Sequence, residues 1–139
     1  MAFRWVADDL VLVVDYSDVL ADGDFDAVLQ SIAARSVGPT GLRMLVYNLG
    51  GGPNAAQRSR FDRQLRGKPI RIAVVCTSPF TRVIIKAFHL LGFHQVAPFA
   101  PDHEEGAFRH LNMKVHEIAL ARNELTKLRA QGQRFAAGA

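Results

Sequence analysis

The stretch VYNLGGGPNAAQRSR, residues 46–60, passes from strand-forming residues through three glycines and a proline into a helix-forming run. The helix is predicted to extend from about Pro53 to Arg66, where Gly67 can take the left-handed conformation that ends a helix. Apolar runs of strand length lie on either side, at 42–49 and 70–76. Such runs are typical of strands that are buried on both faces. The stretch is therefore predicted to be a strand-to-helix turn between two buried strands.

The N-terminal residues predict an antiparallel pair of strands. Apolar segments at Phe3–Val6 and Leu10–Tyr16 flank Asp8 and Asp9. This spacing suits a two-residue hairpin turn between the two segments.

A first helix is predicted to follow this hairpin. Asp22 or Asp24 can cap its start by accepting hydrogen bonds from the first free amides. Gly38 and Pro39 are expected to stop it. Its apolar face recurs at three- and four-residue steps and consists of Phe25, Val28, Leu29 and Ile32.

Another helix is predicted after the strand at 70–76. Ser78 can cap its start, and the helix is expected to end near Gly92. Its predicted apolar face comprises Val83, Ile84, Ala87, Phe88 and Leu91.

A strand at Gln95–Phe99 is predicted next, followed by a short helix. Asp102 and Glu105 have the spacing of a capping box, in which each side chain satisfies an amide at the helix start. The buried side of this helix is predicted to contain Ala107, Phe108 and Leu111.

A C-terminal helix is predicted from about Met113 to Arg129. Its apolar stripe consists of Val115, Ile118, Ala121, Leu125 and Leu128. We favour packing of this stripe within the domain, and the alternative is a dimer or partner surface, because a narrow seam resembles helix pairing. Residues 131–139 are expected to form a flexible tail. A single domain is predicted at 1–130.

The element order β-β-α-β-α-β-α-β-α resembles a known family. The supporting stretches are DVLADGDFDAVLQSI, LRMLVYNLGG, IRIAVVCTS and FAPDHEEGAFRHL, and together they span roughly residues 3–112. They resemble STAS domains (sulphate transporter and anti-sigma-factor antagonist), in particular the SpoIIAA-like branch that is also described as STAS/SEC14. The resemblance implies a mostly parallel sheet with an antiparallel N-terminal strand and helices largely on one side. It also implies binding or regulation without catalysis.

The resemblance places a phosphorylatable Ser or Thr at the strand-to-helix corner of phospho-switch members. Here that corner, residues 48–54, contains no hydroxyl side chain, and Ser59 lies further along the helix. Three interpretations remain open for the corner: a structural turn, which we favour, a partner-recognition surface, and a small-anion or nucleotide site. Glycines and a helix start can approach an anion closely, but neither the P-loop nor the G-x-G-x-x-G motif is present. The candidate binding residues are Gly50, Gly51, Gly52, Asn54, Arg58 and Arg60.

Catalytic and metal-binding patterns are weak. Cys76 ends an apolar strand, so we favour a buried structural thiol over a nucleophile. The histidines at 89, 94, 103, 110 and 116 form neither HExxH nor a Cys/His ligand pair, and no metal or cofactor is expected. The acid pairs at 8–9 and 104–105 are interpreted as turn and helix-start residues rather than an acid/base pair.

Composition favours a soluble cytoplasmic domain. The chain has 139 residues and one cysteine, so an internal disulfide is excluded. Neither a secretion signal nor an apolar run long enough to span a membrane is recognised. The net charge is +4, yet residues 1–30 contain seven Asp and a single Arg. The densest basic group comprises Arg58, Arg60, Arg63, Arg66, Lys68 and Arg71; we favour a solvated surface over a contact with nucleic acid or another anionic partner.

Three classes of function follow. The leading hypothesis is a non-enzymatic STAS-like regulatory or signalling module that binds a protein partner. The second is a domain that uses the glycine-rich corner to bind a small anionic or lipid-like ligand. A cysteine-dependent enzyme is the third and the least favoured.

Overall fold

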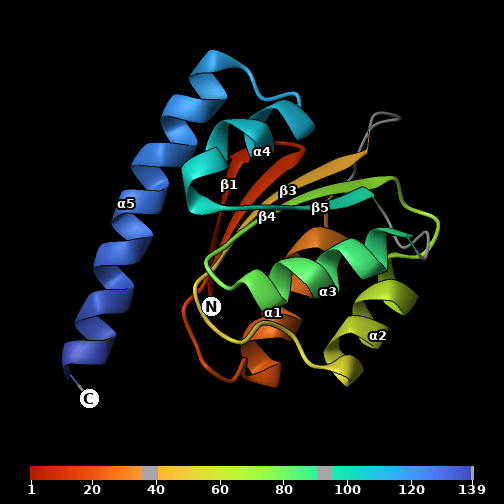
Figure 1. Ribbon diagram of the computed structural model, residues 1–139, viewed down its shortest axis with the longest axis horizontal. Coiled ribbons are helices and arrows are strands. Elements are labelled where there is room, and N and C mark those ends of the chain that lie inside the picture. The colour runs from red at the N-terminus through yellow and green to blue at the C-terminus, as the bar shows by residue number, and fades with distance from the viewer. Residues whose placement is uncertain (36–40, 91–94, 139) are drawn as a thin grey trace.

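The computed structural model describes residues 1–35, 41–90 and 95–138, and its centre is a five-stranded sheet (Figure 1). The strands lie side by side in chain order: β1 (Ala2–Ala7), β2 (Leu10–Asp15), β3 (Leu42–Asn48), β4 (Ile70–Cys76) and β5 (Gln95–Phe99). β1 pairs antiparallel with β2, and the other neighbours are parallel. The predicted hairpin, with its turn at Asp8 and Asp9, is confirmed.

Side chains of the central strands alternate between two apolar cores. On β3, Met44 belongs to one core, whereas Leu45 and Tyr47 belong to the other. β2 and β4 divide their side chains in the same way. The prediction that β3 and β4 are buried on both faces is therefore confirmed, β2 shares this burial, and each face needs its own layer of helices.

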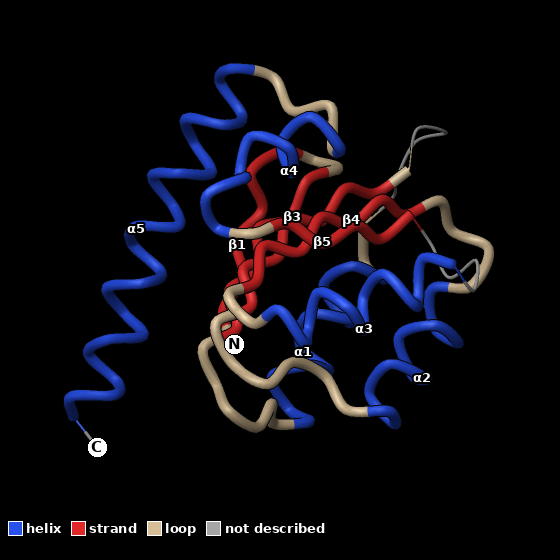
Figure 2. The backbone as a smooth tube through the Cα atoms, viewed as in Figure 1, coloured by secondary structure: helices blue, strands red, loops and turns tan. Residues whose placement is uncertain are grey.

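Helices cover both faces of the sheet (Figure 2). α1 (Asp22–Ala33), α2 (Ala55–Leu65) and α3 (Pro79–Leu90) lie on one side, and α4 (Glu104–His110) and α5 (Val115–Gly138) lie on the other. A short 3-10 helix, Pro101–His103, precedes α4. The order of elements is as predicted. The expectation that helices lie largely on one side holds for α1, α2 and α3, whereas α4 and α5 bury the second apolar face.

The starts of α1 and α4 differ from the predicted caps. α1 begins after Ala21, so Asp22 and Asp24 lie in its first turn and neither caps it. In the first turn, their negative charges still interact favourably with the positive end of the helix dipole. α4 begins after the 3-10 turn, and no side chain caps it, so the capping box of Asp102 and Glu105 is absent.

The starts of α2 and α3 carry side-chain caps. Asn54 accepts a hydrogen bond from the Gln57 amide, and the Gln57 side chain accepts one from the Asn54 amide, which completes a capping box. The predicted Ser78 cap of α3 is confirmed, because its hydroxyl accepts a hydrogen bond from the Thr81 amide at 3.3 Å. The predicted left-handed Gly67 after α2 is also confirmed, with φ at +82°.

The predicted apolar faces are mostly correct. Those of α1 and α4 are buried throughout. On α3, however, Val83 is 65% exposed, while Ile85 packs against the core. The other predicted α3 side chains and two predicted helix ends lie outside the described residues: Ile84, Ala87, Phe88, Leu91, Gly92, Gly38 and Pro39.

α5 packs against the hairpin strands β1 and β2 (Figure 1). Ala121, Leu125 and Leu128 of the predicted stripe are buried in the second core, so packing within the domain is confirmed for them. Val115, by contrast, is 85% exposed. The helix continues to Gly138, beyond the expected end near Arg129 and through most of the segment expected as a tail.

Arg43 of β3 joins the hairpin turn to the start of α5. Its Nε and Nη2 donate to Asp9 at 2.9 and 3.0 Å, and its Nη1 and Nη2 donate to Glu117 at 3.0 and 2.7 Å. Glu117 also accepts a hydrogen bond from the Lys114 amide, which caps α5. The hydrogen bonds from Arg43 lower the pKa of Glu117 to about 2, although burial of the carboxyl opposes this shift.

We predict that Glu117→Gln lowers the free energy of unfolding near neutral pH by roughly 2 kcal/mol, because Arg43 loses a charge-assisted pair while Asp9 still compensates its charge. The wild-type contribution is present above the ordinary pKa of 4.5 and is lost as the pH falls through about 2. Between these values the variant should therefore lose less stability than the wild type. Chemical denaturation at several pH values measures the difference. Glu105→Gln, an exposed neighbour on α4, is the control, and equal pH slopes for wild type and Glu117→Gln would contradict the assignment.

Candidate functional site

A cavity of about 540 Å³ lies between the sheet and the layer of α1, α2 and α3. Its wall is mainly apolar and includes Val13, Met44, Val46, Ile72 and Val74 from the sheet and Phe25, Val28, Leu29, Phe61 and Ile85 from the helices. Ala55 and Ser59 of α2 also line it and are exposed. The cavity therefore reaches the surface beside the start of α2, next to the glycine-rich corner.

Close backbone packing requires two of the three glycines at this corner, and backbone conformation requires the third. A Cβ atom on Gly50 would lie 1.9 Å from the Ser17 carbonyl oxygen, and one on Gly51 would lie 2.3 Å from the Asp18 carbonyl oxygen. Gly52 has a φ of +76°, which side chains rarely adopt. The structural-turn interpretation therefore explains all three glycines.

The amides of this turn are already used within the protein. The Gly50 amide donates to Asn48 Oδ1 at 3.0 Å, and the Gly51 amide donates to the Ser17 carbonyl at 3.1 Å. A phosphate cradle requires several amides that converge on an anion. With two of its three glycine amides engaged, this corner lacks the basis for the anion-site hypothesis.

The two candidate arginines point in different directions. Arg58 lines the cavity and donates from Nη1 to the Pro53 carbonyl at 2.8 Å. Arg60 instead reaches α1, where its Nη2 lies 3.1 Å from Asp22 and 3.2 Å from Asp26. Arg58 therefore points towards the corner. Arg60 pairs with α1 rather than simply facing solvent.

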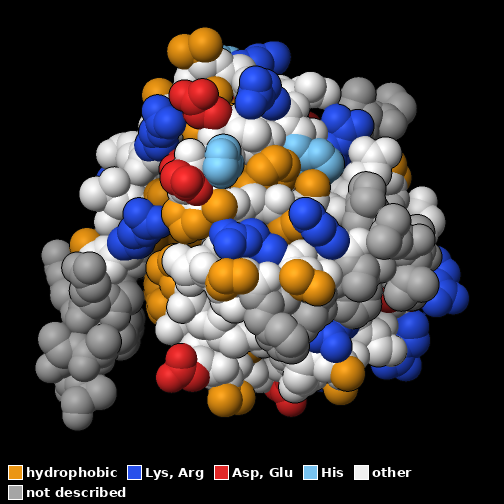
Figure 3. Space-filling model, in the orientation of Figure 1, with side chains coloured by type: hydrophobic (Ala, Val, Ile, Leu, Met, Phe, Trp, Pro, Cys, Tyr) orange, Lys and Arg blue, Asp and Glu red, His pale blue; other side chains and the backbone are white. Residues whose placement is uncertain are grey.

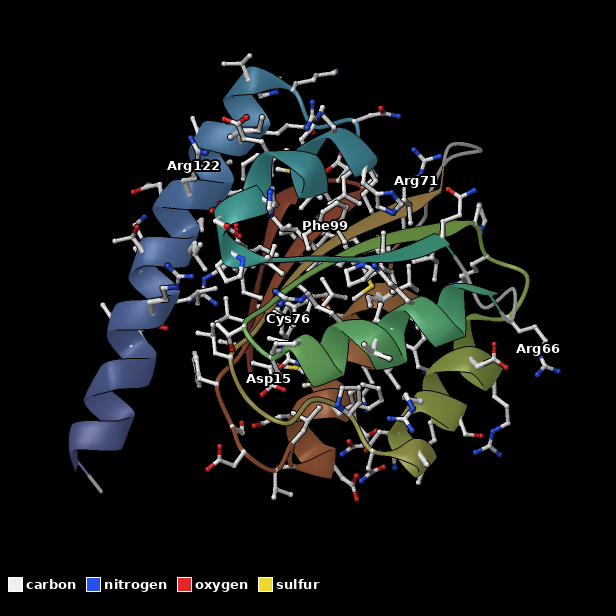
Figure 4. All side chains as sticks on the ribbon, in the orientation of Figure 1. Asp15, Arg66, Arg71, Cys76, Phe99 and Arg122 are labelled. Atoms are coloured by element: carbon white, nitrogen blue, oxygen red, sulfur yellow. The ribbon has the colours of Figure 1, made fainter. Side chains whose placement is uncertain are left out.

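A row of polar side chains ends the central strands on the cavity side of the sheet. Asp15, Asn48 and Cys76 are neighbours in register, and Asn48 lines the cavity. Figure 4 labels Asp15 and Cys76 near the start of α3. In the described part of the chain, the buried Oδ2 of Asp15 has no hydrogen-bond partner. Burial raises the pKa of the Cys76 thiol, which disfavours the nucleophilic thiolate.

The dense basic group of the sequence is divided between the two sides of the sheet. Arg71 donates to the His110 carbonyl on the α4 side of the sheet, whereas Arg66 pairs with Asp62 on α2 (Figure 4). On the face shown in Figure 3, basic side chains are interspersed with apolar and acidic ones. This arrangement favours a solvated surface over a nucleic-acid interface.

The described residues hold no cluster of three or more His, Cys, Asp or Glu side chains suited to a metal ion. His103 lies 3.2 Å from Asp102, and a ring nitrogen of His110 lies 3.1 Å from the Gln95 carbonyl oxygen. His94 and the side chain of His89 lie outside the described part. Within the described residues, no helix is long and apolar enough to cross a membrane.

Sequence reasoning missed a second polar group on the other face of the sheet. Glu104 accepts a hydrogen bond from the buried Tyr47 hydroxyl, although 57 positions separate the two residues. No local sequence pattern indicates that Tyr47 and Glu104 form a pair. A sequence signal did exist for Asp15 and Asn48, because each is a polar residue at the end of an apolar strand.

Comparison with protein-family models, curated proteins and solved structures gives no match for this chain.

We predict that Gly50→Ala lowers the free energy of unfolding by more than about 1 kcal/mol, because the new methyl group would collide with the backbone at Ser17. Gly23→Ala is the matched control: it meets nothing within 4 Å and should be neutral or slightly stabilising. Thermal and chemical unfolding of both variants tests the contact. Equal stability of Gly50→Ala and the wild type would show that this close approach is not needed.

Proposed function

We propose that the chain is a non-enzymatic binding module for a small molecule with an apolar body and one polar end. The observation that carries this proposal is the cavity of about 540 Å³, whose wall is mainly apolar. Its size lies within the range of ordinary small-molecule sites, and such sites combine apolar walls with a few placed polar groups.

The polar end of this ligand is assigned to the corner beside α2. Asn48, Arg58 and Thr81 line the cavity and provide polar groups, whereas the part of the wall formed by Val28, Leu29 and the sheet is apolar. This proposal develops the lipid-like alternative of the sequence analysis. It does not use glycine amides to hold an anion, since two of them are bonded internally.

Several observations support binding rather than catalysis. The Cys76 thiol is buried and its pKa is raised, so the state needed for nucleophilic attack is disfavoured. The corner lacks the hydroxyl expected of a phospho-switch. The five-stranded mixed sheet is compatible with the STAS resemblance, which implies a regulatory role. We therefore propose a STAS-like module that senses or carries its ligand.

We predict that a fluorescent polyene fatty acid binds the wild type saturably at one site. Val46→Phe should weaken this binding at least tenfold, because the half-buried Val46 lines the cavity and a phenyl ring would occupy its space. Val115→Phe should bind like the wild type, because Val115 is exposed at the start of α5. Fluorescence titration gives the affinities, and a melting curve confirms that each variant is folded. Lack of saturable binding by the wild type, or unchanged binding by folded Val46→Phe, would refute the proposal.

A second candidate function is binding of a protein partner at the corner, as the STAS resemblance implies. The supporting observation is that Val19 is 83% exposed and Leu49 is 40% exposed. The close contacts of Gly50 with Ser17 and of Gly51 with Asp18 bring the two loops together. Two exposed apolar side chains beside one corner provide a small contact surface.

For this second candidate, we predict that Val19→Asp reduces capture of a partner from native lysate, while the fatty-acid probe still binds. Val115→Asp is the matched control, because it introduces the same charge at an exposed valine far along the chain. Affinity capture with quantitative mass spectrometry compares the three proteins. A partner that is retained equally by wild type and both variants would remove the corner as its docking surface.

A further inference from the structure

A second cavity, of about 180 Å³, lies on the opposite face of the sheet from the first. Tyr47 of β3 and Thr77, which follows β4, line it at the carboxyl ends of these parallel strands. Glu104 of α4 and Arg129 of α5 complete its polar wall. The cavity therefore brings polar and charged side chains together at the carboxyl ends of two central strands.

The carboxylate of Glu104 is held in place by Tyr47. The Tyr47 side chain is 2% exposed, and its hydroxyl donates to Glu104 Oε1 at 2.5 Å. Burial, followed by this contact with Glu104, raises the pKa of Tyr47, so the hydroxyl remains a donor. Among the described residues, none donates a hydrogen bond to the other oxygen, Oε2. That oxygen keeps its capacity to accept a hydrogen bond from a ligand.

Arg129 supplies a positive charge to the same cavity. Its guanidinium carbon lies 5.5 Å from the centre of the Tyr47 ring. Within the described ranges it forms no ion pair, either with Glu104 or with another acid. A guanidinium presents planar N–H donors that match the two oxygens of a carboxylate. Stacking near Tyr47 leaves these donors available to a ligand.

The two charges limit the chemistry of the occupant. A simple cation would be attracted by Glu104 but repelled by Arg129, and a simple anion would meet the reverse situation. A molecule with both charges satisfies both walls, and the Thr77 hydroxyl offers a further polar contact. We propose that this cavity binds a small zwitterion of amino-acid type, with its ammonium group at Glu104 and its carboxylate at Arg129.

The volume and the apolar lining of the cavity further restrict the class of ligand. Its volume of about 180 Å³ is one third of the 540 Å³ of the first cavity, which favours a small ligand. Leu49, Val75 and Pro101 provide apolar contacts for a short side chain. The expected ligand is therefore a small aliphatic or hydroxylated amino acid rather than an aromatic one.

The experiment is an amide NMR titration of the wild type with glycine, L-alanine, L-serine and β-alanine. At least one should shift the signals of Thr77 and Glu104 saturably, without shifting those of Val13 and Val74 in the first cavity. Acetate and methylammonium, the two halves of the charge pattern, should bind at least tenfold more weakly. This readout is independent of the proposed function of the first cavity.

Two variants test the two charges separately. Glu104→Gln keeps an acceptor for the Tyr47 hydroxyl but removes the negative charge, and Arg129→Gln removes the positive one. Each should weaken zwitterion binding at least tenfold while the variant remains folded. Glu105→Gln and Lys127→Gln, exposed neighbours outside the cavity wall, should bind like the wild type. The proposal is wrong if none of the four zwitterions binds, if acetate or methylammonium binds as tightly, or if folded Glu104→Gln and Arg129→Gln retain full affinity.

Discussion

The burial of β2, β3 and β4 on both faces is the constraint on which the rest of the structure depends. These strands direct alternate apolar side chains to opposite sides, so neither side of the sheet can remain in water without a large hydrophobic cost. One helical layer is built from the crossovers between parallel strands. The other comes from α4 and α5, which follow the last strand. Arg43 fixes this second layer by holding Glu117 and Asp9 at the same guanidinium.

The same alternation places two different environments on opposite faces of the sheet, at the carboxyl end of β3. On β3, Asn48 faces the large apolar cavity, and its neighbour Tyr47 faces the smaller charged one. A side-chain period of two residues is sufficient to separate them. Adjacent positions on one strand thus line two cavities of different character, and the two proposed sites share a backbone without sharing a wall.

The sequence predicts the strands and most helices well, because their signals are local. Apolar runs mark β3 and β4, and glycine with proline marks the end of α2. Cap residues are predicted less well: Asp22 and Asp102 have the right chemistry, but the backbone begins each helix elsewhere. The family resemblance predicts helices largely on one side of the sheet, which describes α1, α2 and α3 but not the second layer formed by α4 and α5.

The candidate site could be predicted only in part. The glycine-rich corner was located correctly, yet its contact with Ser17 and Asp18 depends on the approach of a distant loop. The cavity depends on how α1, α2 and α3 sit over the sheet, which periodicity does not specify. Arg60 illustrates the limit, since its place in the predicted helix does not reveal its partners on α1.

The place of α5 in the chain has a consequence for synthesis on the ribosome. The helix covers the face of the hairpin that carries Leu10, Leu12 and Val14, but it follows all five strands in the sequence. While α5 is still inside the exit tunnel, this apolar surface of the nascent chain is exposed to solvent on the α5 side. The hairpin leaves the ribosome before the helix that buries this face. The apolar area available to a chaperone is therefore largest at this stage of translation.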